Sequence, residues 1–195
     1  MKFEKEVTIE VDSTLEELQK VLEENNFEIK EEYDVNDIYM IPKNYDSTED
    51  VLELLKKCIL LRDIIEEAKE RKRITYKYKE YNDKKEIVKQ GKLDCEITSI
   101  EEAKALFEVL NYEEYITIND HLIVYSNGKD DLCVQLVNDK HIYIEIEDNC
   151  HYADHYYETL EEMKGVFKKY NIPMKGDNYF VKKAEVEIKE RYYNE

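Results

Sequence analysis

Glycine is scarce in this sequence: the chain of 195 residues has only 4 glycines, together with 2 prolines and no tryptophan. Phosphate-binding loops and dinucleotide fingerprints need several glycines close together, so that the backbone can approach the phosphates. The glycines here are too far apart for either motif, at Gly91, Gly128, Gly165 and Gly176. If this protein handles phosphate groups, its side chains must contact them.

Cysteines and long apolar runs are also few. The 4 cysteines include no C-x-x-C pair and do not have the spacing of a small disulfide scaffold. Reduced, partly buried thiols in a cytoplasmic protein explain Cys58, Cys95, Cys133 and Cys150 most simply. No run approaches the ~20 apolar residues that a membrane span needs, and the N-terminus has no apolar signal region. We therefore expect a cytoplasmic protein with no membrane span.

Positive charge is in deficit, because 29 Lys and Arg residues stand against 47 Asp and Glu residues, a net charge of −18. A field of that sign repels nucleic acid and anionic membranes, so neither is expected as a partner. It permits a basic partner, or an acidic shell around a locally basic pocket. The 42% hydrophobic content and 17 tyrosines supply a core, and the length favours a single domain over residues 1–195.

The order of predicted elements favours an α+β fold. Strands are expected over residues 3–11, 37–42, 73–79, 115–125 and 131–137. Three more are expected: one that ends at residues 92–96, one that carries residues 145 and 147, and a last one near residues 178–190. Helices are expected over residues 14–25, 48–57, 100–110 and 155–170, whereas 58–65 fits a strand or a helix continuing to about residue 72. Helices that join mostly antiparallel strands indicate α+β, and a barrel is one way to hide the sheet edges.

Two Glu-x-Glu pairs are candidates for a metal site. They are Glu4 with Glu6, and Glu145 with Glu147. In a strand, residues i and i+2 project to one face, so each pair presents two carboxylates side by side. That arrangement suits a hard divalent cation. A solvated strand face is the simpler alternative for either pair taken alone.

The segment 73–79 is the clearest strand. Its apolar side chains share one face, and the other face carries Arg73, Thr75, Lys77 and Lys79. The charged face could point inward, as in a barrel with a polar lumen, or outward to solvent. An exposed strand that pairs with acidic neighbours is the alternative to an anion-binding face.

Six short motifs follow one another along the chain: Glu4-x-Glu6, Asp37-Ile-Tyr39, Leu61-Arg62, Thr75-Tyr76-Lys77, Lys92-x-Asp94-x-Glu96 and Glu145-x-Glu147. Taken in this order, they resemble the CYTH superfamily, the triphosphate tunnel metalloenzymes, which include class IV adenylyl cyclases and thiamine triphosphatases. No single motif is specific, and the ordered set from residue 3 to about residue 150 carries the resemblance. The resemblance implies a mainly antiparallel, eight-stranded, tunnel-like barrel with flanking helices.

The resemblance also implies roles for particular residues. Mg²⁺ or Mn²⁺ would be held by Glu4, Glu6, Glu145 and Glu147. The phosphates of a small-molecule triphosphate would be held by Arg62, Arg73, Lys77, Lys79 and Lys92, with Asp94 and Glu96 completing the acidic side. Cations on the phosphate oxygens fit the chemistry of cyclising or hydrolysing so dense an anion. The resemblance leans toward the class IV adenylyl cyclases; it names no catalytic residue, and a homodimer stays open.

The basic half of the family pattern is less complete than the acidic half. Thr8 stands where the family's Glu-x-Glu-x-Lys has lysine, and Ile64 stands where its Leu-Arg-Ile-Arg has the second arginine. The family's later Lys-x-Arg falls near Asn119 and His121. Weak triphosphate binding, an altered substrate or loss of catalysis would follow. The alternative function is a non-catalytic CYTH-like binding protein that captures a phosphorylated ligand or a protein partner.

Two further patterns have simpler explanations. Glu185 and Glu187 begin a literal Glu-x-Glu-x-Lys near the end of the chain, which we interpret as a coincidence in a glutamate-rich sequence. His151 and His155 would lie one turn apart on a helix, as zinc ligands can. An exposed helix start explains these histidines better, because the glutamate that a metalloprotease motif requires after the first histidine is missing.

Overall fold

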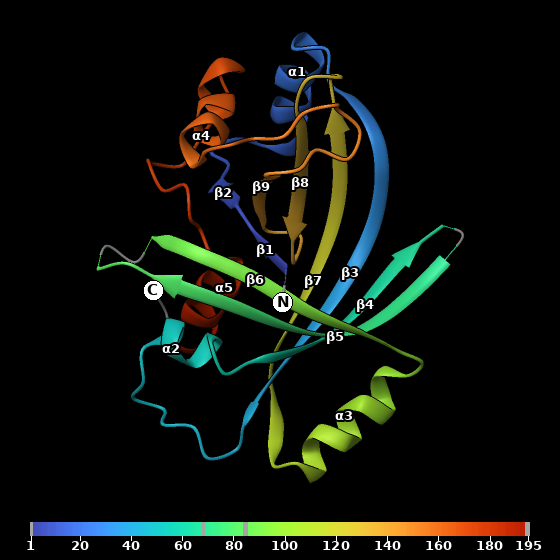
Figure 1. Ribbon diagram of the computed structural model, residues 1–195, viewed down its shortest axis with the longest axis vertical. Coiled ribbons are helices and arrows are strands. Elements are labelled where there is room, and N and C mark those ends of the chain that lie inside the picture. The colour runs from blue at the N-terminus through green and yellow to red at the C-terminus, as the bar shows by residue number, and fades with distance from the viewer. Residues whose placement is uncertain (1, 68, 84–85, 194–195) are drawn as a thin grey trace. The chain divides into compact units, whose positions relative to one another are not determined.

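The computed structural model describes residues 2–67, 69–83 and 86–193, in which nine strands and five helices are found (Figure 1). The strands follow the hydrogen-bonded order β1-β6-β5-β4-β3-β7-β8-β9-β2. The α+β class and the mainly antiparallel sheet are confirmed, with nine strands rather than eight. The chain divides into two compact units: unit 1 contains residues 1–3, 34–119 and 182–195, and unit 2 contains residues 4–33 and 120–181. The single domain stays a prediction.

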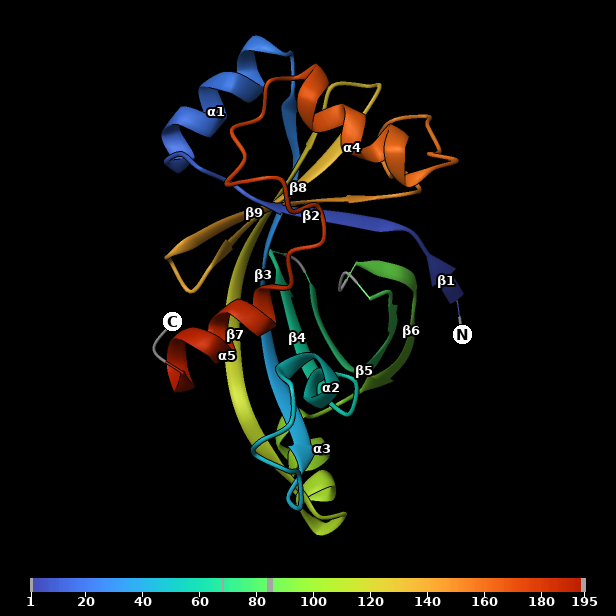
Figure 2. The same cartoon turned by 90° about the vertical axis from the view of Figure 1, so that its left-hand side faces the viewer.

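Unit 1 contains one end of the strand order, from β1 to the first half of β7. Its elements are most of β1 (Lys2–Glu4), most of β3 (Glu28–Pro42), α2 (Val51–Leu55), β4 (Ile59–Glu66), β5 (Lys69–Tyr81), β6 (Ile87–Ile97), α3 (Ile100–Val109), the first half of β7 (Tyr112–Ser126) and α5 (Lys183–Tyr192). Residues 59–66 are therefore a strand, which decides between the two alternatives for that segment. The helices α2 and α5 lie side by side (Figures 1 and 2).

The expected last strand, near residues 178–190, is wrong, because residues 183–192 form helix α5. Its buried side chains are Ala184 and Ile188, four residues apart, which is a helical and not a strand period. Glu185 forms an ion pair with Lys189 at 3.3 Å along the same helix. The second Glu-x-Glu-x-Lys is therefore no strand motif, which agrees with its interpretation as a coincidence.

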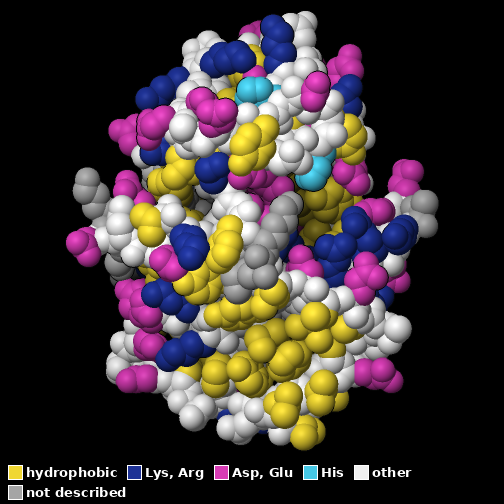
Figure 3. Space-filling model, viewed as in Figure 1, with side chains coloured by type: hydrophobic (Ala, Val, Ile, Leu, Met, Phe, Trp, Pro, Cys, Tyr) yellow, Lys and Arg dark blue, Asp and Glu magenta, His cyan; other side chains and the backbone are white. Residues whose placement is uncertain are grey.

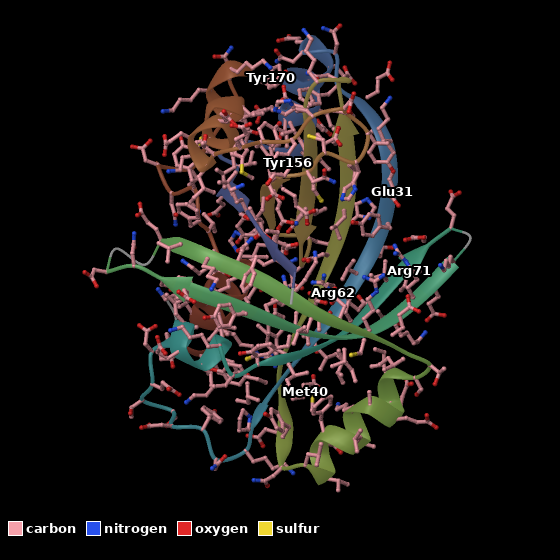
Figure 4. The ribbon with its side chains drawn as sticks, viewed as in Figure 1. Glu31, Met40, Arg62, Arg71, Tyr156 and Tyr170 are labelled. Atoms are coloured by element: carbon pink, nitrogen blue, oxygen red, sulfur yellow. The ribbon has the colours of Figure 1, made fainter. Side chains whose placement is uncertain are left out.

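Helix α3 packs on one face of the unit 1 sheet. A buried cluster joins the helix to β3 and β4 and contains Met40, Leu61, Ile100, Ala103 and Phe107 (Figure 4). Ile38, Leu61 and Ile74 pair across β3, β4 and β5, so these apolar side chains project toward the helix. Because side chains alternate along a strand, the charged residues at the intervening positions project to the other face.

Unit 2 combines helices α1 (Leu15–Glu24) and α4 (Leu160–Lys169) with strands β2 (Glu6–Glu10), β8 (Asp131–Val137) and β9 (His141–Glu147), and with parts of β3 and β7. Figures 1 and 2 show both helices on one side of β2, β8 and β9. Val7, Ile144 and Ile146 are fully buried, or nearly so. The predicted hairpin at Asn127-Gly128 is confirmed, and Gly128 supplies the positive φ of 78° that its turn requires.

A buried carboxylate joins several parts of unit 2. Asp130 accepts hydrogen bonds from the phenols of Tyr157 and Tyr170 at 2.5 Å each, and from Lys169 Nζ at 2.8 Å (Figure 4). Burial would raise the pKa of Asp130, but these three donors outweigh it and lower the pKa. Its partners lie at the C-terminal end of α4 and in the loop before the helix, so the cluster anchors these segments to the β7–β8 hairpin.

Two element boundaries differ from the prediction because distant residues bind the backbone. The expected strand 3–11 is divided at Lys5, whose N–H donates to Asp148 Oδ2 at 3.1 Å and whose C=O accepts from the Asp148 N–H at 3.0 Å. The expected helix 155–170 begins only at Leu160. The preceding loop is held by Asp131, which accepts the N–H groups of His151 and Tyr152 at 2.7 Å each. His151 and His155 therefore do not lie on a helix.

Candidate phosphate-binding and metal-binding faces

A row of charged side chains crosses the unit 1 sheet on the face opposite α3. In the antiparallel register, Asp37 pairs with Arg62, and Arg62 pairs with Arg73. Further along β5 and β6, Lys77 pairs with Lys92. Directly paired residues project to the same face. We call this set of five the basic face: Arg62, Arg73, Lys77, Lys79 and Lys92. The structure brings all five predicted phosphate-binding residues onto one face of one sheet.

The residues of the basic face are half-buried, and none of the five is fully exposed. The predicted acidic residues of this face, Asp94 and Glu96, are exposed. Thr75 is buried and donates to Asp94 Oδ1 at 2.6 Å, which fixes that carboxylate across from β5. On the side of the molecule shown in Figure 3, basic and acidic side chains are interspersed.

Asp37 and Arg62 form a buried ion pair at the centre of the charged row. Asp37 is 0% exposed and accepts hydrogen bonds from Arg62 Nε at 2.7 Å and Arg62 Nη2 at 2.6 Å (Figure 4). Burial would raise the pKa of Asp37, but Arg62, followed by Lys183 and Lys77, outweighs burial and lowers the pKa. Lys183 comes from the start of α5, so a sixth cation lies near this face that the sequence did not identify.

The non-basic position at Ile64 lies on the same face as the charged row. Ile64 is 7% exposed and pairs with Arg71 of β5. The Nη2 atom of Arg71, which is labelled in Figure 4, forms an ion pair with Glu66. An arginine is therefore present across from Ile64, with part of its guanidinium already engaged.

Three of the four predicted metal ligands lie on one face of β2 and β9 in unit 2. Glu6 pairs with Glu147, and Thr8 pairs with Glu145. The two strands thus place Glu6, Glu145 and Glu147 on the face opposite Val7 and Ile146. Glu4 belongs to β1 and is separated from β2 at Lys5, so it is not part of this ladder.

The donor chemistry of this acidic face suits a hard divalent ion, because carboxylate oxygens are the ligands that Mg²⁺ and Mn²⁺ prefer. The side chains are directed to other partners. Gln135 Nε2 donates to Glu145 at 3.2 Å, and His151 Nε2 lies 3.6 Å from Glu147 Oε2. Among the described residues, no three His, Cys, Asp or Glu side chains gather closely enough to hold a metal ion. The residue types and the shared face fit a metal, and the side-chain positions do not yet enclose one.

Comparison with known proteins identifies the fold. No family model and no curated protein matches the sequence. Among solved structures, the PH1819 protein of Pyrococcus horikoshii is 17% identical with a TM-score of 0.70, over 96% of this chain and 100% of that chain. HpAC1 of Hippeastrum, a putative adenylyl cyclase with a dominant triphosphatase activity, is 12% identical with a TM-score of 0.62, over 98% and 96%. A chain of the Schizosaccharomyces pombe Mediator head module is 12% identical with a TM-score of 0.62, over 92% and 99%.

These identities are low, so the likeness establishes the fold and not the activity. Along the described residues, no helix is long and apolar enough to cross a membrane. The α+β architecture and the agreement with HpAC1 over nearly the whole chain lead to one conclusion. The protein shares the fold of HpAC1 and of the PH1819 protein.

Proposed function

We propose that this protein is a divalent-metal-dependent enzyme that acts on a nucleotide or another triphosphate, by hydrolysis or by cyclisation. The basic face of unit 1 carries the proposal. Lys77 lies directly across from Lys92 on half-buried positions, in a chain of net charge −18. Like charges directly opposite each other on a sheet are destabilising. A bound polyanion would relieve this repulsion, and the fold shared with a triphosphatase supports a triphosphate as that anion.

In this proposal the two halves of the family pattern keep separate tasks. Lys77, Lys79, Lys92 and Arg73 bind phosphate oxygens, and Arg62 is held in a fixed orientation by Asp37. Glu6, Glu145 and Glu147, with Glu4, would hold Mg²⁺ or Mn²⁺. When bound, such an ion neutralises phosphate charge and lowers the barrier to displacement.

The test is an assay with Mg²⁺ or Mn²⁺ and either ATP or tripolyphosphate, in which phosphate, pyrophosphate and cyclic product are all followed. Replacing Lys77 with Met should lower kcat/KM about tenfold or more, because one charge-assisted hydrogen bond is lost. Lys89→Met is the matched control, because Lys89 is an exposed lysine of β6 whose side chain projects to the face of the sheet opposite the basic face. It should stay within about twofold of the wild-type value. If neither substrate is turned over with either metal, the proposal that the protein is an enzyme is refuted.

The alternative is a non-catalytic binding protein on the same fold. Two observations favour it: the guanidinium of Arg62 already makes two hydrogen bonds to Asp37, and Ile64 supplies no charge where the family has an arginine. The Mediator head module gives an example of this fold in an assembly. Calorimetric binding of tripolyphosphate that is weakened by Lys77→Met, without turnover by the wild type, would establish this alternative.

A further inference from the structure

Gln90 on β6 has an unusual environment that the proposed function does not explain. Its side chain is 4% exposed, and neither Nε2 nor Oε1 has a hydrogen-bond partner among the described residues. A buried polar atom without a partner loses its bonds to water and gains none in return. Few such groups occur in native proteins, and each needs an explanation. A leucine of similar size would fill this position without that penalty.

The position of Gln90 connects it to the basic face. It pairs directly with Lys79, and it lies two residues before Lys92 on the same strand. Side chains two residues apart, and side chains directly paired, project to one face of the sheet. The unpartnered amide therefore lies among three of the lysines proposed to bind phosphate: Lys77, Lys79 and Lys92.

The chemistry of the amide narrows the kind of ligand that satisfies it. A glutamine side chain offers an N–H donor and a carbonyl acceptor side by side. A fully ionised inorganic polyphosphate carries acceptors only, so it could pair with Nε2 but would leave Oε1 without a donor. A nucleobase edge presents both kinds of group, as the adenine N6 amino group and N7 do to glutamine in nucleic-acid recognition.

We propose that Gln90 binds the organic part of an organic triphosphate through paired donor and acceptor hydrogen bonds, and so selects a nucleotide over inorganic tripolyphosphate. This inference rests on the proposed function, because the neighbouring lysines must hold the phosphates. Gln90 is buried without ligand, so binding requires neighbouring side chains to move, and Lys79, directly across from Gln90, has a long flexible stem that allows this.

The test compares ATP with tripolyphosphate by calorimetry in the presence of Mg²⁺, for the wild type, Gln90→Leu and the control Lys89→Met. Gln90→Leu should weaken ATP binding about tenfold or more and should change tripolyphosphate binding by less than about twofold. Thermal unfolding without ligand should show Gln90→Leu to be at least as stable as the wild type, because the unpaired polar atoms are gone. Gln90→Met, with a more flexible side chain, replaces it if the leucine variant does not fold.

The outcomes separate this inference from the proposed function. If Gln90→Leu weakens the binding of ATP and of tripolyphosphate equally, Gln90 is a phosphate contact or a structural residue. If the variant binds ATP unchanged, Gln90 is not part of the site. Either result overturns this inference and leaves the proposed function standing. A wild-type protein that binds neither ATP nor tripolyphosphate would overturn the proposed function, and the inference with it.

Discussion

Replacing Arg62 with Met tests the charged row of unit 1 most sharply. Asp37 is 0% exposed and receives hydrogen bonds of 2.7 and 2.6 Å from Arg62, so the change leaves a buried carboxylate without its main counter-ion. Removing one partner of a buried ion pair costs about 3–5 kcal/mol. Lys183 and Lys77 still act on Asp37, and the Arg62 side chain is 23% exposed. We therefore expect a loss at the lower end, about 3 kcal/mol.

The pH dependence gives this prediction a definite sign. In the wild type the pKa of Asp37 is lowered, so its contribution to stability is full at neutral pH and is lost only as the pH falls below the ordinary carboxyl pKa of about 3.9. In Arg62→Met, burial without the arginine raises the pKa of Asp37. Protonation then removes the penalty as the pH falls toward about 4. The difference in stability between the two proteins should therefore narrow from pH 7.5 to pH 4.5.

Urea unfolding at both pH values measures that difference, and a melting temperature lower by ~6–12 °C at neutral pH should accompany it. Arg71→Met is the control, because its ion pair with Glu66 is solvent-accessible and should contribute about 1 kcal/mol or less. The double variant Asp37→Asn with Arg62→Met should recover part of the loss, since no buried charge remains. A loss under about 1 kcal/mol, or a difference that does not change with pH, would refute the reasoning.

Two further predictions concern side chains outside the basic face. Tyr157→Phe removes a 2.5 Å hydrogen bond to the buried carboxylate of Asp130 and should lower the free energy of unfolding in urea by about 1.5–3 kcal/mol. Tyr156→Phe, at a residue that is 52% exposed, should lower it by less than about 0.5 kcal/mol. Equal losses would contradict the role of Tyr157 in stabilising the Asp130 carboxylate. Burial raises the pKa of Cys58 to about 12, so an alkylating reagent at pH 8 should modify the exposed Cys95 first and reach Cys58 only on unfolding. Mass spectrometry of partly labelled protein measures the order in which these cysteines are alkylated.

Strands with a strict period of two were predictable from the sequence, and those ended by distant contacts were not. The alternation over residues 73–79 lies inside β5, where Ile74 packs against the α3 cluster while the basic side chains project to the other face. The break at Lys5 depends on Asp148, 143 positions away, and no local pattern records it. Helix α5 was missed for a related reason. Glutamates alternate with apolar residues over 185–188, as in a strand, but Ala184 and Ile188 are the buried positions.

The same distinction separates the predictable part of the candidate site from the rest. The alternation of apolar and polar residues along each strand determines which side chains share a face, and Arg62, Arg73 and Lys77 do lie on one face. Lys183 could not be found, because its proximity to Asp37 depends on how α5 packs in unit 1. Gln90 did leave a signal: it extends the alternation of Lys92 and Asp94 by one more step toward the start of β6.

Both candidate faces place like charges directly across from each other, and this cost distinguishes them from ordinary strand surfaces. Lys77 pairs with Lys92 in unit 1, and Glu6 pairs with Glu147 in unit 2, although salt-bridging pairs of opposite charge are favoured on a sheet. On a face that binds a polyanion or a divalent cation, the bound ligand would relieve this repulsion, so such a ligand gives a reason for like charges to stand in these pairs.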